Sequence, residues 1–272
     1  MAKEFLNQKS FELRNKVLDI FSYGNRGHIP SAFSVIEVLT TLYYQHVDIE
    51  KIKKNTEDRD RIILSKGHGC LSLYSILHDH GLIKEDELKS YCRPGSVLGG
   101  HPTKGKIIGI EASTGSLGLG PSVAVGMATE LKRKKRSSHV YVIVGDGEIN
   151  EGSVWEALLS VGNKNLDNFT IIIDYNKFQS YSSTEEVCDL NPLKEKLEAF
   201  KLNTFEVDMI NEPENLLLCL QEKSSTPKAI ICHSIKGQGS DLLEGNLHWH
   251  HKSYLSDEEV EKVRASLKRR EF

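Results

Sequence analysis

The sequence predicts an α/β protein built on a mostly parallel sheet with helices on both faces. Short apolar runs rich in Val and Ile alternate with helical segments, and each run is continuously apolar. Continuous apolar runs are typical of strands buried on both faces, and strand–helix–strand alternation favours parallel pairing. We expect five strands, at residues 61–65, 140–144, 170–174, 204–208 and 228–235.

Helices are expected before and between these strands. Apolar residues from Phe5 to Phe21 fall near helical spacing up to the turn GNRG, and a second helix is expected from about Ser31 to Tyr43. A capped C-terminal helix is expected after Leu255, where the sequence reads SDEE. The clearest later helices, three of which open with a proline, cover residues 121–131, 153–162, 192–200 and 213–223. Because no repeat or long linker interrupts the pattern, we expect one domain over residues 1–272.

The composition narrows the class of protein. The 272 residues carry a net charge of -3, with 27% charged and 39% hydrophobic residues, which excludes global disorder. This charge argues against a nucleic-acid or membrane-surface partner. Five widely spaced cysteines without a CxxC pair exclude a zinc ribbon and favour a reducing compartment. No apolar stretch reaches the roughly 20 residues of a membrane span, so we expect a cytoplasmic protein.

Polar residues follow two of the predicted strands. Asp146 stands between two glycines directly after the strand at 140–144, and Asn176 follows the next strand. The carboxyl ends of neighbouring parallel strands lie at one edge of a sheet, where such sheets bind ligands. A carboxylate and an amide oxygen placed side by side suit Mg²⁺ or Ca²⁺. The GDG tripeptide alone is more often a tight turn, but the pair of motifs resembles the known binding motif for thiamine diphosphate and its metal.

Further motifs extend this pattern into a family resemblance. The chain resembles the N-terminal, diphosphate-binding region of transketolase, and most of all the separate N-terminal subunit of split transketolases. The sequences SKGHG and GDG-x-x-x-EGSVWEA are the most specific matches. The matching segments, in the order of the family, are 27–39, 59–74, 99–102, 113–120, 145–158, 166–180 and 236–252. The resemblance implies transfer of a two-carbon ketol unit from a ketose or ketose phosphate to an aldose or aldose phosphate, in carbohydrate metabolism of the pentose phosphate type.

The resemblance also implies residue roles. The metal ligands would be Asp146, Asn176 and the carbonyl of Phe178. Histidines near the reacting carbon would be His28, His68, His101 and His250, and the donor sugar would contact His28, Ser31, His101 and His250. Imidazoles suit proton transfers at sugar oxygens near neutral pH. The cofactor would contact His68, Gly115, Ser116, Leu117, Gly118, Asp146, Gly147, Glu148, Asn176 and His250. Glu151 would belong to a network between subunits.

Some residues depart from the family or invite a simpler interpretation. The family usually has glycine where His251 stands and glutamine where Leu119 stands. We interpret the basic run KRKKR at 132–136 as the end of a helix, where cations are favoured. His248, His250 and His251 lack a carboxylate or cysteine at ligand spacing, so zinc is not expected there. Cys70 is expected to be a small apolar core residue.

The resemblance also predicts a partner. Transketolases carry a glutamate and an aromatic surface for the aminopyrimidine ring on a second domain, which this sequence does not contain. We therefore expect a C-terminal subunit with the pyrimidine-binding domain, an α₂β₂ assembly, and poor binding of thiamine diphosphate by the isolated chain. Two alternatives stay open. One is an alpha-type subunit of another split thiamine enzyme, such as a 2-oxo acid dehydrogenase or a deoxyxylulose-phosphate-synthase-like protein. The other is a non-catalytic paralogue that binds a partner.

Overall fold

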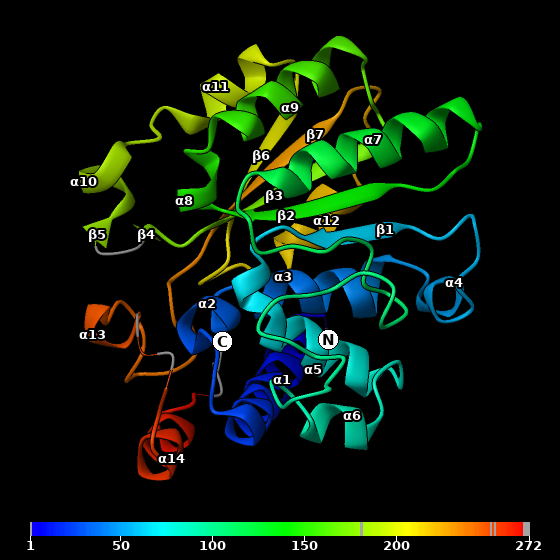
Figure 1. Ribbon diagram of the computed structural model, residues 1–272. Coiled ribbons are helices and arrows are strands. Elements are labelled where there is room, and N and C mark those ends of the chain that lie inside the picture. Colours follow the sequence, from blue (N-terminus) through cyan, green and yellow to red (C-terminus); the bar gives the residue numbers. More distant parts are fainter. Residues whose placement is uncertain (1, 180–181, 251, 253, 269–272) are drawn as a thin grey trace.

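The computed structural model describes residues 2–179, 182–250, 252 and 254–268, and is built on one parallel sheet (Figure 1). All five predicted strands form, each with ends within two residues of the expected ones. Their order across the sheet is β1 (Arg61–Leu64), β2 (Val140–Gly145), β3 (Phe169–Tyr175), β7 (Lys228–His233) and β6 (Asn203–Asp208). A small antiparallel hairpin, β4 (Phe178–Gln179) with β5 (Ser182–Ser183), follows β3.

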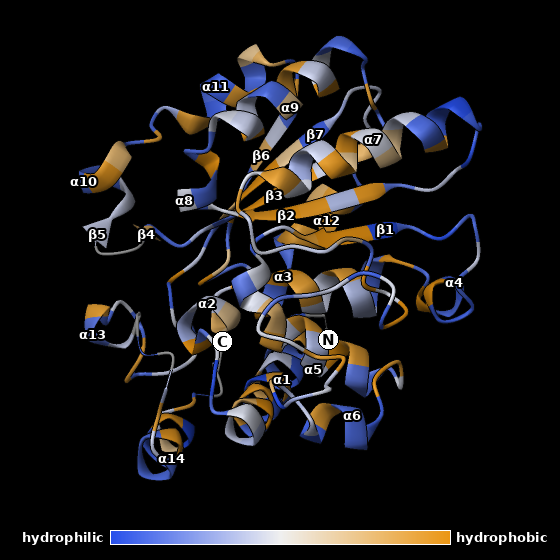
Figure 2. Ribbon diagram, in the orientation of Figure 1, coloured by the Kyte–Doolittle hydropathy of each residue, from blue (hydrophilic) through white to orange (hydrophobic). Residues whose placement is uncertain are grey.

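Helices cover both faces of the sheet, as the continuous apolar runs predict. Alternate strand residues face opposite sides: Val142 packs with the helices on one face, and Ile143 packs with those on the other. Apolar residues accordingly fill the strands and the inner sides of the helices (Figure 2). The first face carries α7 (Leu119–Arg133), α9 (Gly152–Asn163) and α11 (Leu193–Ala199). The second carries α1 (Ala2–Gly24), α5 (Cys70–Asp79) and α12 (Asn215–Gln221), together with the short helices that follow α1.

The helix expected from Ser31 to Tyr43 is not continuous, so this prediction was wrong in detail. The chain forms α2 (Ile29–Phe33), α3 (Ile36–Thr41) and the π-helical turn η1 (Leu42–His46). The break falls at Ser34, whose hydroxyl donates to Ser31 O at 3.3 Å and to Asp174 Oδ2 at 2.6 Å. A side chain that bonds locally and to a distant carboxylate competes with regular helix. The break thereby ties this segment to the end of β3.

The remaining helices are short. Their bounds are α4 (Ile49–Lys53), η2 (Gly67–Gly69), α6 (Glu85–Lys89), α8 (Asp146–Ile149), α10 (Thr184–Cys188), α13 (Leu247–His250) and α14 (Asp257–Ala265). The predicted capped helix is α14, where Ser256 Oγ accepts from Glu259 N at 3.2 Å. The basic run ends α7 as expected, and Lys132 Nζ lies 2.7 Å from Asp167 Oδ1. In the described ranges, every helix is too short or too polar to cross a bilayer.

Candidate functional site

A cavity of about 390 Å³ opens at the carboxyl ends of the central strands. Lys66 follows β1, Asp146 follows β2 and Asn176 follows β3, and the parallel register pairs Gly145 with Asp174. Side chains that lie more than a hundred residues apart in the sequence therefore meet at one edge of the sheet. The polar side chains that line the cavity include His28, Ser31, Lys66, His68, Asp146 and Lys236.

Three residues that line this cavity, Asp146, Asn176 and Phe178, each carry an oxygen of the kind that binds hard cations. Asp146 is 2% exposed, and its Oδ2 accepts from Lys177 N at 2.6 Å and from Thr184 Oγ1 at 3.2 Å. Asn176 Oδ1 accepts from Phe178 N at 3.2 Å, and the Asn176 and Phe178 residues both line the cavity. Burial, followed by the nearby Asp174 carboxylate, raises the pKa of Asp146 to about 6. A nearby positive charge would stabilise the ionised form of this buried carboxylate. Together with the amide and carbonyl oxygens, it fits a Mg²⁺ or Ca²⁺ ion.

Positive side chains face the same space. Lys236 Nζ lies 3.5 Å from Phe178 O, and burial, followed by the Lys66 ammonium, lowers the pKa of Lys236 to about 8. Opposite them, the loop before α7 turns at Gly118, with φ of +82°. A Cβ at Gly118 would lie 2.5 Å from Ser153 Oγ, so the close approach and the left-handed backbone both require glycine here. Two buried ammonium groups beside a glycine loop fit an anionic diphosphate.

Histidines occupy the side of the cavity formed by α2 and η2. The rings of His28 and His68 are 5.9 Å apart in an edge-to-face arrangement, and Ser31 lines the cavity beside them. Burial, followed by Lys66, lowers the pKa of His68 well below its usual value, so this imidazole is neutral near pH 7. His101 packs against Gly115, because a Cβ on Gly115 would lie 3.1 Å from its ring. His250 ends α13, and its side chain and residue 251 lie outside the described part of the chain.

The remaining predicted residues differ in exposure. Glu148 is buried and accepts from Gly118 N at 2.9 Å and from Gly145 N at 3.2 Å, so it holds the glycine loop as well as lining the cavity. Glu151 lies at the exposed N-terminus of α9 and also lines the cavity, as do Gly115, Leu117 and Gly147. Ser116 is exposed on the same loop and is not among the residues that line the cavity.

Sequence analysis missed three charged residues of the site. Lys66, Lys236 and Asp174 are each less than 9% exposed, and Lys66 forms a buried ion pair with Asp174. Each of the three could have been recognised from its place in the sequence. Lys66 and Lys236 lie inside the matched motifs SKGHG and KGQG, and Asp174 is a charge inside an otherwise apolar strand.

The simpler interpretation of Cys70 is confirmed, whereas the His250 side chain and residue 251 of the histidine-rich segment lie outside the described part of the chain. The Cys70 thiol is buried, donates to Gly100 O at 3.1 Å, and burial raises its pKa to about 12, so it is not a nucleophile. Among residues whose side chains are described, no three His, Cys, Asp or Glu residues gather in a metal-binding group. The oxygen site above differs because an amide and a carbonyl complete it.

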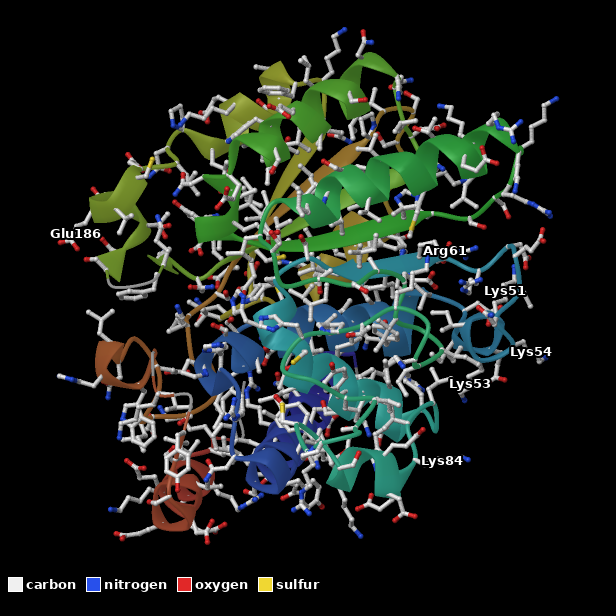
Figure 3. All side chains as sticks on the ribbon, in the orientation of Figure 1. Lys51, Lys53, Lys54, Arg61, Lys84 and Glu186 are labelled. Atoms are coloured by element: carbon white, nitrogen blue, oxygen red, sulfur yellow. The ribbon has the colours of Figure 1, made fainter. Side chains whose placement is uncertain are left out.

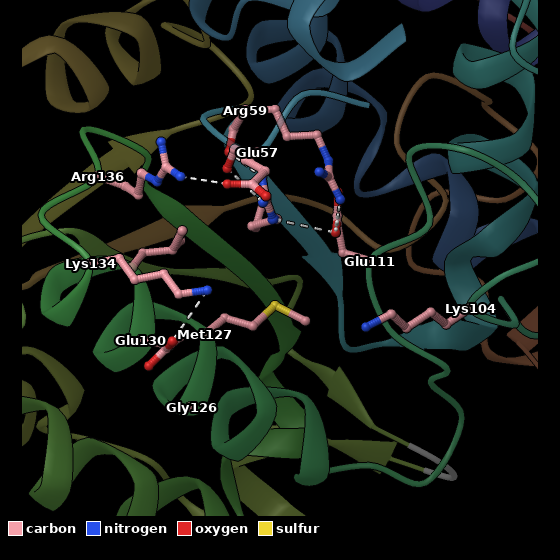
Figure 4. A pocket seen from close by; sticks show the side chains of 11 residues that line it. Glu57, Arg59, Lys104, Glu111, Gly126, Met127, Glu130, Lys134 and Arg136 are labelled. Atoms are coloured by element: carbon pink, nitrogen blue, oxygen red, sulfur yellow. Dashed lines mark hydrogen bonds and ion pairs between the residues drawn. The ribbon is translucent and has the colours of Figure 1, made fainter. Parts of the chain in front are cut away.

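A second cavity, of about 490 Å³, lies at the opposite edge of the sheet, between α7 and the start of β1 (Figure 4). Its charged side chains pair with each other. Arg59 donates to both carboxylate oxygens of Glu111, at 2.8 and 3.0 Å, and Lys134 Nζ lies 3.4 Å from Glu130 Oε1. Most of these charges are therefore already compensated, and the cavity is a weaker candidate despite its size.

Comparisons with known proteins identify the family of this chain. The family profile described as "Transketolase, thiamine diphosphate binding domain" matches residues 7–270. The chain is 36% identical to a subunit of the apulose-4-phosphate transketolase of Actinobacillus succinogenes, over 95% of this chain and 94% of that protein. It is 37% identical to the 6-deoxy-6-sulfo-D-fructose transketolase subunit SqwG of Clostridium sp. (strain MSTE9), over 82% of each.

A solved structure gives the same result. The transketolase from Leishmania mexicana superimposes with a TM-score of 0.86 at 27% identity, over 96% of this chain. The match covers 41% of that larger enzyme, so this chain spans about two fifths of its length. The sheet and its helices are thus the thiamine diphosphate-binding α/β fold, and the chain belongs to the transketolase family.

Proposed function

We propose that this chain is the diphosphate-binding subunit of a two-subunit transketolase, acting as one domain with a second polypeptide that carries the pyrimidine-binding domain. Two observations support the partner. The chain spans nearly the whole length of a relative that is itself named as one subunit of a transketolase, and about two fifths of the larger Leishmania enzyme. We also propose an α₂β₂ assembly with the cofactor between unlike subunits, and five free thiols suit a cytoplasmic enzyme.

The observation that carries the proposal is the cavity itself, where an oxygen donor set, buried ammonium groups and a pair of histidines meet. Asp146, Asn176 and the Phe178 carbonyl would hold Mg²⁺, and Lys236 with the loop at 115–118 would hold the diphosphate. When bound, thiamine diphosphate supplies the carbon nucleophile that accepts a two-carbon ketol unit. The chain itself supplies charge, orientation and proton acceptors.

The histidines determine what the chain does for the substrate. A ketose presents a carbonyl and several hydroxyls, and bond cleavage beside them requires proton movement at oxygen. Because His68 is neutral near pH 7, one of its nitrogens can accept a proton while the other donates. His28 and Ser31 would orient the donor hydroxyls next to it, and His101 would approach from the glycine loop.

The substrate class follows from the relatives. Their names describe a ketose phosphate for one and a sulfonated fructose for the other, so both names refer to ketoses with an anionic end. We infer the same class for this chain, with an aldose acceptor. The other split thiamine enzymes considered from the sequence are less favoured, since the histidine pair suits a polyhydroxylated sugar better than a 2-oxo acid.

The test is to capture the partner from native cells with the tagged full-length chain. We expect a stoichiometric companion whose sequence contains the pyrimidine-side glutamate, and an intact-complex mass of two copies of each subunit. The captured complex should transfer ketol units from anionic ketoses when supplied with Mg²⁺ and thiamine diphosphate. A chain recovered alone, and inert with both, would contradict the enzyme proposal and favour the binding paralogue.

A further inference from the structure

Asp174 is a buried carboxylate directly behind the proposed metal ligands. It is fully buried near the end of β3, two residues before Asn176. Its Oδ2 accepts from Ser34 Oγ at 2.6 Å, from Lys66 Nζ, and from Asn176 Nδ2 at 3.3 Å. Its Oδ1 accepts from Ser234 Oγ at 2.5 Å. Burial alone would raise the pKa of this carboxyl, but the Lys66 ammonium and the hydrogen bonds from Lys66, Ser234 and Ser34 together outweigh burial and lower it.

These contacts join four of the segments that line the cavity. Ser34 follows α2, which carries Ser31, and Lys66 lies two residues before His68. Ser234 lies two residues before Lys236, and Asn176 is itself a proposed metal ligand. One side chain of a central strand therefore touches each of these four segments.

The contact with Asn176 has a specific chemical consequence. An amide can turn over, exchanging its oxygen for its nitrogen, and only its hydrogen-bond partners decide which way it points. An ionised carboxylate can only accept, so Asp174 binds the Asn176 nitrogen and excludes the oxygen. On the other side, the Phe178 N–H donates to Asn176 Oδ1 at 3.2 Å. Both partners leave the amide oxygen on the side away from Asp174.

We propose that Asp174 is a positioning residue for the metal site: it orients the Asn176 amide so that its oxygen faces the bound cation, while Lys66, Ser34 and Ser234 hold the carboxylate in place. This inference rests on the proposed function, since it assumes that Asn176 ligates a metal. Outer-shell partners of metal ligands commonly change metal affinity by about 10- to 100-fold when removed. In the Asp174→Asn variant, residue 174 could donate as well as accept, so the Asn176 amide would lose its single orientation.

The experiment measures Mn²⁺ affinity by electron paramagnetic resonance, with thiamine diphosphate present, on the complex captured with the full-length chain. We expect Asp174→Asn to weaken Mn²⁺ binding by about 10- to 100-fold. Ser34→Ala and Ser234→Ala each remove one hydrogen bond from the carboxylate but leave it beside Asn176, so each should weaken Mn²⁺ binding less than Asp174→Asn does. The matched control is Asp208→Asn, an exposed aspartate at the end of edge strand β6, which bonds the turn at 210–211.

The outcomes separate the inference from the proposed function. Wild-type complex that fails to bind Mn²⁺ would overturn both. If the wild-type complex binds Mn²⁺ and a folded Asp174→Asn variant binds it equally tightly, only the positioning role of Asp174 is overturned. If Asp174→Asn does not fold because Lys66 loses its counter-charge, the double variant Asp174→Asn with Lys66→Met removes the buried ammonium as well. That variant should fold and still bind Mn²⁺ weakly, and normal Mn²⁺ affinity in it would contradict the inference.

Discussion

Charged residues are arranged differently at the two ends of the strands. We call the end where the strands begin the amino edge, and the end where they finish the carboxyl edge. At the edge where the strands begin, the larger cavity holds arginines already paired with glutamates, and the Arg136–Glu57 pair reaches solvent. At the edge where the strands end, the smaller cavity holds Asp146, Glu148 and Lys66 at no more than 2% exposure. In Figure 3, Arg61 marks the first edge at the start of β1, and Glu186 on α10 lies toward the second.

The difference shows that cavity size does not identify the site here. Exposed ion pairs such as Arg136–Glu57 contribute little, whereas buried charges are costly unless they are paired or bound. At the carboxyl edge, Lys66 is paired with Asp174, while a cation would compensate the Asp146 carboxylate and a diphosphate would compensate the Lys236 ammonium. We therefore expect changes at that edge to alter activity, and changes at the amino edge to alter stability.

The largest effect is expected from Asp146→Ala, which removes the only carboxylate of the proposed metal-binding trio. A bound cation contributes several kcal/mol of charge stabilisation, and each 1.4 kcal/mol is about tenfold, so kcat/KM of the complex should fall by about 10³-fold or more. Steady-state ketol transfer at saturating Mg²⁺ measures this. Asp208→Ala is the control at the same edge of the sheet, and equal activities of the two variants would remove the metal site from this cavity.

The next effect is expected from His28→Ala. A positioned acid–base group contributes about 10²- to 10⁴-fold, and because His68 remains 5.9 Å away we expect a loss of about 10²-fold in kcat/KM. The unfolding temperature should hardly change, since the ring lies at a cavity. His233→Ala provides the matched control: this histidine ends β7 at the same edge and contacts Glu206 at 2.9 Å. Similar losses in both variants would mean that His28 has no special role.

The strands and the residues that follow them at the carboxyl edge could be predicted from the sequence, because strands and turns are encoded locally. The run VYVIV followed by Gly145 and Asp146 specifies a buried strand and a tight turn within seven residues, and β2 begins and ends there. The second proposed metal ligand could be placed in the same way, since Asn176 directly follows the neighbouring strand. In both cases the apolar pattern and the position after a strand are sufficient.

Contacts between distant segments could not be predicted in the same way. Ser34 breaks its helix to bond Asp174, which lies 140 residues later, and no local pattern reports such a contact. The ion pair of Lys66 with Asp174 spans 108 residues for the same reason. Sequence analysis therefore found most of the residues that line the cavity, but missed Lys66 and Lys236 and the buried Asp174 that holds four segments together.

A smaller effect is expected from pH at the amino edge. His139 stacks on Tyr141 at 4.5 Å between ring centroids, and burial, followed by Lys228, lowers the pKa of His139 to about 3 from 6.5. As the pH falls below about 6.5, His139 takes up a proton in the unfolded chain but not in the folded chain. The contribution of His139 to stability is therefore complete above pH 6.5 and is lost as the pH falls toward 3. The free energy of unfolding should fall by up to about 1.4 kcal/mol per pH unit for this group. Denaturant titrations at several pH values measure the slope, which His139→Gln should reduce; an unchanged slope would contradict the assignment.

The smallest effect is expected from Arg136→Ala in the larger cavity. Arg136 Nη2 lies 2.5 Å from Glu57 Oε2, but the two side chains are 41% and 80% exposed. Exposed pairs contribute about 0–1 kcal/mol, because water and salt screen them. We expect the variant to keep full ketol-transfer activity and to lose at most about 1 kcal/mol of stability in low salt, and less in high salt. A large loss of activity, with the fold intact, would mean that this cavity takes part in function and would reverse the contrast between the two edges. The double variant Arg136→Ala with Glu57→Ala separates the causes, since it should restore stability if only the unpaired glutamate matters.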